Sequence, residues 1–324
     1  FYDILYIKEY SRGILFLLEG SKVKKAVIDV GTNSVRMLMG QLKGNGIFEP
    51  VNYRVEITRL GEGMGRENKL TGEGVKRTLK VIKDYLREIK GQGADKIWIT
   101  ATSAVREAEN RDSFISRVKE DTGLELKVLS GEEEAELSYY GVIKSLPGIQ
   151  GSPLVFDLGG GSTEFIWKEK GEVICRSCKI GVVRLTEAFF QEDPPASQEV
   201  ERAKRHAVEI LQEMKEGLEV KGEKLIGVGG TITSLAAVRQ ELEEYDPDRV
   251  HGFVLRREEM ELLLKRFISL EERDRRKIPG LQPQRADVII AGTVALMAIM
   301  DTFQFKEVTV SEGDILLGIL YSFN

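Results

Sequence analysis

The chain has 324 residues, of which 42% are hydrophobic and 31% charged, and its 47 basic and 52 acidic residues give a net charge of −5. This length and composition predict two globular domains and exclude a disordered, collagen-like or membrane-embedded chain. Two cysteines exclude a disulfide-framed secreted scaffold, and the overall charge gives no sign of nucleic-acid binding.

Residues 1–20 are predicted to be an N-terminal extension of unknown role. Their one apolar run, Gly13–Leu18, has six residues, whereas a bilayer crossing takes about 20. No clear signal peptide is present. We therefore expect a cytoplasmic protein with no membrane partner.

From residue 24 onward, predicted strands and helices alternate. The strands expected in the first half are Lys24–Val30, Ser34–Leu42, Val51–Leu60, Ala94–Ala101 and Leu124–Leu129. The helices expected there are one capped by Thr71 and running to Ile89, then Arg111–Asp121 and Gly131–Ser145.

The second half repeats this alternation. The strands expected there are Leu154–Leu158, Thr163–Lys168, Val173–Ile180, Lys224–Val228 and Lys306–Val310. The expected helices are Ser197–Val220 (capped by Ser197, with Glu201 close behind), Thr231–Glu241, Glu258–Ile268, Arg285–Phe303 and Asp314–Tyr321. The repeated order predicts an α/β protein whose sheets are covered by helices.

One pattern occurs twice. Val27–Arg36 and Val155–Glu164 both read as a strand, an aspartate, an apolar residue, glycine, small polar residues and a second strand. The two aspartates are 128 residues apart, which is too far for a solenoid repeat and indicates two copies of one domain. We place the first domain at 21–134 and the second at 135–324, with the last helix, about 314–324, packing back on the first.

Each of these hairpins can hold phosphate. Their glycines let backbone N–H groups converge on an anion, and side chains such as Asn33 and Ser162 add donors. Their carboxylates can hold a divalent metal. A third loop, Gly229–Thr233, precedes a helix whose first N–H groups favour phosphate. The three loops together predict a site for a phosphate chain.

These loops resemble the nucleotide loops of the actin/Hsp70/sugar-kinase superfamily. Within it, the chain resembles the exopolyphosphatase / guanosine pentaphosphate phosphohydrolase (Ppx/GppA) family over about residues 24–322. The matching stretches are Ile28–Arg36, Thr58–Gly61, Thr100–Asn110, Ser130–Ala135, Phe156–Glu164, Gly181–Glu187, Gly229–Ala236 and His251-Gly252. The resemblance implies an α/β fold of two actin-like (ribonuclease H-like) lobes with an interdomain cleft.

The resemblance also implies roles for individual residues. Glu134, the second glutamate of the family's G-x-E-E-A stretch, matches the catalytic base. Asp157 and Glu164, with Asp29 as their counterpart in the first hairpin, match metal-binding acids, and Mg²⁺ or another divalent cation is the implied cofactor. The implied phosphate contacts are Asn33, Ser34, Arg36, Arg106, Gly159, Gly160, Gly161, Ser162, Thr231 and Arg285.

The expected activity is hydrolysis of a terminal phosphoanhydride, which needs charge neutralisation and an aligned water more than covalent chemistry. It would release orthophosphate from inorganic polyphosphate, convert pppGpp to ppGpp, or do both. Two alternatives stay open, an ATP-dependent small-molecule kinase and a non-catalytic nucleotide- or ppGpp-binding regulator. The substrate is the expected partner, and a homodimer is left open.

The C-terminal stretch departs from the family pattern Ser-x-x-Gly-Leu-Arg-x-Gly. Asp314 stands where the pattern has Gly, and Leu316 stands where it has Arg. The departure puts contacts from this end of the chain in doubt and leaves the three loops untouched.

Three other features are interpreted as structural rather than functional. Cys175 and Cys178 form a C-x-x-C pair, but a strand sends such residues to opposite faces, which hinders a shared metal or disulfide. His251 is expected to be a packed structural residue. The basic region Arg249–Arg285 is interpreted as a solvated helix face.

Overall fold

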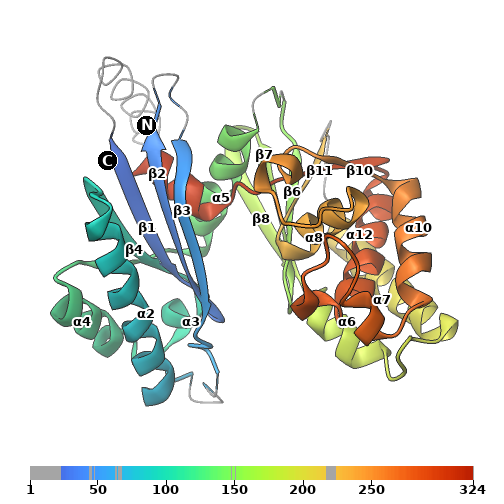
Figure 1. The fold of residues 1–324 in the computed structure, drawn as a ribbon, viewed down its shortest axis with the longest axis horizontal. Coiled ribbons are helices and arrows are strands. Elements are labelled where there is room, and N and C mark those ends of the chain that lie inside the picture. The colour runs from blue at the N-terminus through green and yellow to red at the C-terminus, as the bar shows by residue number, and fades with distance from the viewer. Residues whose placement is uncertain are drawn as a thin grey trace. The chain divides into compact units, whose positions relative to one another are not determined.

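The computed structural model describes residues 23–43, 46, 48–62, 64, 68–146, 148–149, 151–216 and 224–323. The predicted extension at 1–20 lies outside them. The chain divides into two compact units, Phe1–Lys144 with Ile315–Asn324, and Ser145–Asp314. Each unit has its own sheet with helices packed on it (Figure 1), and the predicted α/β class is confirmed.

The first unit contains a five-stranded sheet in the order β3-β2-β1-β4-β5. Its strands are β1 (Lys24–Val30), β2 (Ser34–Leu42), β3 (Phe48–Ile57), β4 (Lys96–Ala101) and β5 (Leu126–Val128). Its helices are α2 (Gly72–Gly91), α3 (Ser103–Glu107), α4 (Arg111–Thr122), α5 (Gly131–Ser145) and α13 (Ile315–Ser322).

The two faces of this sheet are covered by different helices. Ile28 on β1 belongs to the core shared with α2, whose apolar residues recur at helical spacing behind the N-cap Thr71. Val27, one residue earlier on β1, points to the other face and joins the core formed with α13. Leu316 of α13 is fully buried there, so the position where the family pattern has Arg is a core position in this chain.

The second unit contains a six-stranded sheet in the order β10-β11-β9-β6-β7-β8. Its strands are β6 (Leu154–Leu158), β7 (Thr163–Glu169), β8 (Glu172–Cys178), β9 (Leu225–Val228), β10 (Val254–Arg256) and β11 (Glu307–Val310). Its helices are α6 (Val182–Phe189), α7 (Ser197–Lys215), α8 (Gly230–Arg239), α9 (Pro247–Val250), α10 (Arg257–Ile268), α11 (Glu272–Arg275), α12 (Ile289–Phe303) and the 3₁₀ helix η2 (Pro283–Arg285).

The internal repeat of the sequence is a repeat of topology. In the first sheet β1 pairs antiparallel with β2 and parallel with β4, and in the second β6 pairs antiparallel with β7 and parallel with β9. The order β3-β2-β1-β4-β5 thus recurs as β8-β7-β6-β9-β11. This duplication is the actin-like arrangement that the sequence predicted.

Several predicted bounds differ from the structure. The predicted domain boundary at 134/135 lies inside α5, because that helix continues to Ser145, and the units divide at its end. The strand predicted at Val51–Leu60 is Phe48–Ile57. The expected cap Ser197 is wrong, since the N-cap of α7 is Ala196 and the carboxylate of Glu199 accepts its N–H at 2.9 Å.

The region Arg249–Arg285 is only in part the solvated face that was predicted. Arg273 and Lys277 are exposed and pair with Asp274. Arg275 is buried, 3% exposed, and its guanidinium binds Asp193 at 2.9 Å and the carbonyl oxygen of Ala286 at 2.9 Å. One arginine of the strip is therefore part of the fold. Among the residues that the structure describes, no helix has both the length and the apolar run needed to cross a membrane.

Candidate active site

The first glycine loop joins β1 to β2 and is held from behind by the segment after β3. The carbonyl oxygen of Asn33 accepts the N–H groups of Thr58 (3.0 Å) and Arg59 (2.8 Å), and that of Thr32 accepts the N–H of Gly61 (2.9 Å). A Cβ on Gly61 would lie 2.5 Å from Thr32 Cγ2, so only glycine fits this contact. The predicted Asn33 side chain stays exposed at the tip.

The second glycine loop, between β6 and β7, is held in the same way by α6. The carbonyl oxygens of Gly159 and Gly160 accept the N–H groups of Val182 and Val183, each at 3.0 Å. Gly181 begins this segment, and a Cβ there would lie 2.3 Å from the carbonyl oxygen of Gly160. With its carbonyls turned toward α6, the loop can present N–H groups to an anion.

The sequence analysis identified Thr58–Gly61 and Gly181–Glu187 as motifs, but it did not predict that they hold the two glycine loops in place. It did not predict α6, because the stretch begins with two valines and its N-cap, Gly181, offers no capping side chain. The signal that could have found this function is a glycine after each hairpin, Gly61 and Gly181, where a second backbone must approach closely.

The third loop brings one phosphate-site candidate and one metal candidate together in the second unit. Gly229 has φ +100°, and a Cβ on it would lie 2.8 Å from Asp157 Oδ1. A Cβ on Gly230 would lie 1.8 Å from Nη2 of Arg285, so this guanidinium packs directly on the first residue of α8. A helix start with a guanidinium beside it suits a phosphate group.

Thr231 is a different case from its neighbours. It is 2% exposed, and its methyl group packs so closely on Gly292 of α12 that a Cβ on Gly292 would lie 2.2 Å away. Its side chain is therefore turned into the core. The backbone N–H, near the start of α8, is the group with which Thr231 could contact phosphate.

Two carboxylates face the same side of the second hairpin. Asp157 of β6 is directly opposite Glu164 of β7, which puts their Cβ atoms about 4.5–5.5 Å apart. Glu164 Oε1 accepts the hydroxyls of Ser162 (2.7 Å) and Ser177 (2.8 Å). These hydrogen bonds fix one carboxylate oxygen and orient the other.

This pair fits a hard divalent cation. Mg²⁺ is commonly held by one or two carboxylates, with waters and substrate phosphates completing its coordination. No group of three or more His, Cys, Asp or Glu side chains suited to a metal occurs among the described residues. Asp157 and Glu164 are therefore the residues that would hold such a cation, and their role as metal ligands stays a prediction.

Asp29 stands at the equivalent place in the first hairpin, but its surroundings differ. It is 1% exposed, its Oδ2 binds Arg36 at 2.8 Å and its Oδ1 accepts the hydroxyl of Thr100 at 3.2 Å. Both carboxylate oxygens are therefore engaged inside the unit. Its role as a metal ligand stays a prediction, and Arg36, which is partly exposed, is held by it.

Glu134, the predicted base, lies in the first turn of α5. Its Oε2 accepts a hydrogen bond from Nη1 of Arg106 at 2.9 Å. The same Nη1 also donates to the carbonyl oxygen of Leu129 at 2.9 Å. Glu134 and Arg106 both keep about a third of their side-chain surface exposed, at 34% and 29%. The structure therefore brings the predicted base and a predicted phosphate-binding arginine into direct contact.

The neighbouring Glu133 has a capping role instead. Ser130 and Glu133 form a reciprocal capping box: the Ser130 N–H donates to Oε2 of Glu133, and the Glu133 N–H donates to Oγ of Ser130. Burial opposes ionisation of Glu133, but hydrogen bonds from Lys127 and from the Ser130 N–H outweigh it and lower the pKa of that carboxyl. The two adjacent glutamates thus have separate roles.

The structural interpretations of His251 and of the C-x-x-C pair agree with the structure. His251 Nε2 lies 2.8 Å from the carbonyl oxygen of Ser145, and its Nδ1 accepts the N–H of Glu312 at 3.1 Å, so both ring nitrogens are used in packing contacts. Cys175 is exposed and Cys178 is buried, as alternation along β8 requires. Burial raises the pKa of Cys178 to about 11, which keeps it a thiol.

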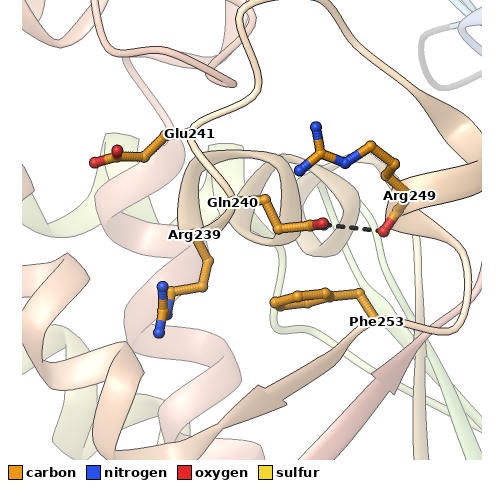
Figure 2. Close-up of a pocket in the computed structure, with 5 residues that line it drawn as sticks. All are labelled: Arg239, Gln240, Glu241, Arg249 and Phe253. Atoms are coloured by element: carbon orange, nitrogen blue, oxygen red, sulfur yellow. Dashed lines mark hydrogen bonds between the residues drawn. The ribbon is translucent and has the colours of Figure 1, made fainter.

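A hollow of about 550 Å³ lies at the C-terminal end of α8. Figure 2 shows its lining residues, Arg239, Gln240, Glu241, Arg249 and Phe253. The Gln240 amide donates to the carbonyl oxygen of Arg249 at 2.9 Å. No predicted site residue lines this hollow, so it is separate from the glycine loops at the other end of α8.

Two units of the same topology, each with a glycine loop fixed from behind, form the scaffold on which the sequence predicted a site for a phosphate chain. The chain belongs to the Ppx/GppA phosphatase family, whose family model matches residues 40–323. It is therefore a hydrolase of phosphoanhydride bonds, as the sequence predicted.

Its relatives include proteins of several bacteria. It is 34% identical to exopolyphosphatase 2 of Mycobacterium tuberculosis, over 92% of this chain and 97% of the relative. It is 37% identical to the bifunctional 3-dehydroquinate synthase/phosphatase of Fusobacterium nucleatum, over 91% of this chain but 46% of the relative, so it spans about half of that protein. A crystal structure of the Aquifex aeolicus Ppx/GppA phosphatase, type II variant, superposes with a TM-score of 0.84 at 32% identity, covering 93% of this chain and 99% of that one.

Proposed function

We propose that this chain, in the cytoplasm, uses Mg²⁺ to hydrolyse the terminal phosphoanhydride of a polyphosphate chain, releasing orthophosphate. The substrates are inorganic polyphosphate, pppGpp, or both. The observation that carries the proposal is the contact between Glu134 and Arg106 in the first turn of α5, because it pairs a carboxylate base with a phosphate-binding cation. The M. tuberculosis relative, an exopolyphosphatase by name, supports the substrate class.

The reaction assigns each side chain a task. Arg36, Arg106 and Arg285 neutralise phosphate oxygens by charge-assisted hydrogen bonds. The water oxygen attacks the terminal phosphorus, its proton passes to the carboxylate of Glu134, and the bridging oxygen leaves with the electron pair of the broken P–O bond. Mg²⁺ held by Asp157 and Glu164 would supply charge neutralisation on the phosphates.

The contact with Arg106 positions the base. The guanidinium holds the carboxylate of Glu134 in place, and this carboxylate can accept a proton from water only when it is turned toward that water. Substrate phosphate competes for the same guanidinium, so binding of the substrate would release Glu134 toward the water. Binding and activation are in this way coupled through one arginine.

The test is phosphate release with Mg²⁺ from long-chain polyphosphate and from pppGpp, with Glu134→Gln beside the wild type and binding measured separately. We expect the wild type to release phosphate and the variant to bind substrate with little turnover. Binding without phosphate release by the wild type would contradict the proposal and favour a regulator. Phosphate transfer that requires an acceptor alcohol would favour a kinase.

A further inference from the structure

The segment that carries Arg285 is packed tightly on α8. Gly280, at its start, has φ +85°, and a Cβ on it would lie 2.4 Å from the carbonyl oxygen of Ala237. The positive φ and this close approach both require glycine at position 280. Five residues later, the guanidinium of Arg285 packs on Gly230, the first residue of the same helix. The segment thus touches α8 at two points, and Arg285 is at the second of them.

Arg275 of α11 holds the same segment from another part of the unit. Its Nε donates to the carbonyl oxygen of Ala286, the residue next to Arg285, at 2.9 Å. Its Nη1 donates to the carbonyl oxygen of Leu270 at 2.6 Å, and its Nη2 binds Oδ1 of Asp193 at 2.9 Å. The planar guanidinium thus joins three stretches of the chain by hydrogen bonds of fixed direction.

Asp193 connects this arginine to the second glycine loop. It lies four residues after the end of α6, and the first N–H groups of α6 bind the carbonyl oxygens of Gly159 and Gly160. Oδ2 of Asp193 accepts the N–H of Glu272 at 2.7 Å, so one carboxylate binds the first and the last residue of α11. Its contacts therefore run from the helix behind the second loop to the segment that carries the third loop's arginine.

Stability alone gives little reason for this ion pair. Arg275 is 3% exposed, and it is the only buried arginine among the residues that the structure describes. Taking a guanidinium out of water is costly, and a buried ion pair is often no more stable than apolar side chains of the same volume. What the pair supplies, and apolar side chains do not, is direction, because it fixes the carbonyl group of Ala286 relative to Asp193.

Two further hydrogen bonds of Arg285 are local. Its backbone N–H and its Nε both donate to Gln282, three residues earlier, at 2.9 and 3.0 Å. These bonds shape the turn η2 but do not join it to the rest of the unit. Apolar side chains pack the segment into the core, and Arg275 adds a hydrogen bond of defined direction to the carbonyl oxygen of Ala286.

We propose that Arg275, held by Asp193, is a positioning residue for Arg285 and therefore for the phosphate bound at the third loop. The inference rests on the proposed phosphoanhydride hydrolysis, in which Arg285 binds a phosphate oxygen. Arg275 acts through the backbone of Ala286, since its own guanidinium is buried and engaged. A displaced Arg285 guanidinium forms longer and weaker hydrogen bonds to phosphate, so the predicted consequence of losing the pair is weaker binding.

The experiment is a double-mutant cycle between positions 193 and 285. Asp193→Ala removes a carboxylate whose side chain is 44% exposed, Arg285→Gln removes the phosphate-binding charge, and a third variant combines the two. The matched control is Asp301→Ala on α12, which breaks the ion pair with Arg257 (2.7 Å) at an aspartate of similar exposure, 40%. Asp193→Asn, which keeps the shape of the side chain, takes the place of Asp193→Ala if that variant does not fold.

Binding and stability are measured separately. Dissociation constants for inorganic tripolyphosphate are measured by calorimetry with Mg²⁺, in the Glu134→Gln background so that the ligand stays intact. KM and kcat are measured with Glu134 in place, and melting temperatures report the stability of each variant. A contact that serves only the fold lowers the melting temperature without changing the affinity for phosphate.

We expect Asp193→Ala to raise the Kd and the KM about 3–10-fold and to leave kcat within about 2-fold, because it removes binding and not chemistry. It should also lower the melting temperature. In the Arg285→Gln background, the same change should alter the Kd less than about 2-fold, since the displaced group is already absent. The control Asp301→Ala should lower the melting temperature and change the Kd less than about 2-fold.

Several results would overturn the inference. An unchanged Kd for Asp193→Ala with a lower melting temperature would show that the pair serves only the fold. Equal rises of the Kd in both backgrounds, or an unchanged Kd for Arg285→Gln, would show that the effect does not pass through Arg285. If the wild type binds tripolyphosphate but hydrolyses none, the proposed function fails, and the dissociation constants still decide the inference. A wild type that does not bind tripolyphosphate would overturn both.

Discussion

The two glycine hairpins have the same backbone plan but opposite electrostatics. In the first, the strand-end aspartate Asp29 is opposite Arg36, and the two side chains form an ion pair at 2.8 Å. In the second, Asp157 is opposite Glu164, so two carboxylates share one face. Asp29 is 1% exposed, whereas Asp157 is exposed.

The difference shows how a duplicated hairpin can divide two tasks. A buried carboxylate must be paired, and Arg36 and Thr100 pair Asp29. Like charges opposite one another on a sheet are unfavourable unless something neutralises them. The first hairpin therefore pairs its own charges and orients an arginine, while the second places two carboxylates where the proposed Mg²⁺ would bind.

The largest effect we expect is on the base, which neither hairpin supplies. Glu134→Gln removes the proton acceptor and should lower kcat by about 10²–10⁴-fold. Its neighbour Glu132, exposed in the same helical turn, provides the matched control Glu132→Gln. Phosphate-release assays at saturating substrate measure both. Similar losses in the two variants would show that a general loss of charge, not a base, is responsible.

The next largest effect is expected at the second hairpin, which carries Asp157 and Glu164. Asp157→Asn removes one of the two carboxylates and should raise the Mg²⁺ concentration for half-maximal activity by about 10–100-fold, since carboxylate charge governs the affinity. A Mg²⁺ titration at fixed substrate measures this. An unchanged Mg²⁺ requirement would contradict the assignment of the metal to the second hairpin.

A smaller effect is expected from the third loop. Gly230→Ala places a Cβ where Nη2 of Arg285 now lies, so the guanidinium must move. Losing one charge-assisted hydrogen bond to phosphate, about 1.5–3 kcal/mol, corresponds to a rise in KM of roughly 10-fold or more. The control is Gly72→Ala at the start of α2, where a Cβ meets nothing within 4 Å. Steady-state kinetics with unchanged KM for Gly230→Ala would remove Arg285 from the site.

For the first hairpin, with its Asp29–Arg36 ion pair, we expect a loss of stability and no change in the Mg²⁺ requirement. Asp29→Asn leaves Arg36 without its buried counter-charge and should lower the free energy of unfolding by about 1–3 kcal/mol. It should raise KM a few-fold because Arg36 loses its anchor, and leave the Mg²⁺ requirement unchanged. Thermal melts and the same Mg²⁺ titration measure both. A shifted Mg²⁺ requirement would instead support Asp29 as a metal ligand.

Much of this fold could be predicted from the sequence because its signals are local. β1, β2 and β6 have the predicted bounds, and α5 begins and ends at the predicted residues. The repeat of an aspartate before glycine marked both hairpins. At α7 the helix begins at the predicted Ser197 but the predicted cap was wrong, because the N-cap is Ala196 and the carboxylate of Glu199 accepts its N–H.

The candidate site was harder to predict, because its contacts join distant parts of the chain. Glu134 and Arg106 are 28 residues apart, and Arg106 lies on α3, a five-residue helix too short to show periodicity. The pairing of Asp29 with Arg36 depends on the hairpin register, and its burial depends on Thr100 from β4. The sequence identified these residues one by one, and packing decided which of them touch.

The smallest predicted effect extends the comparison down the first strand of each hairpin. Four residues before the aspartate, β1 has Lys25, where the second unit has Pro153. Lys25 is 8% exposed, and its ammonium donates to the carbonyl oxygens of Leu320 (3.3 Å) and Phe323 (2.7 Å). Burial, with a smaller contribution from Lys96, lowers the pKa of Lys25 to about 8 from its ordinary 10.5.

This shift fixes the sign of a pH dependence. Between pH 8 and 10.5 the unfolded chain binds more protons at this lysine than the folded chain, so the stability contributed by Lys25 rises with pH in that window. Lys25→Met has no such titration. The melting temperature of the wild type should therefore rise relative to that of the variant by about 2–4 °C from pH 8 to 9.5. Melting curves that stay parallel across this range would show that Lys25 keeps its ordinary pKa, and the two hairpin strands would then differ only at their aspartates.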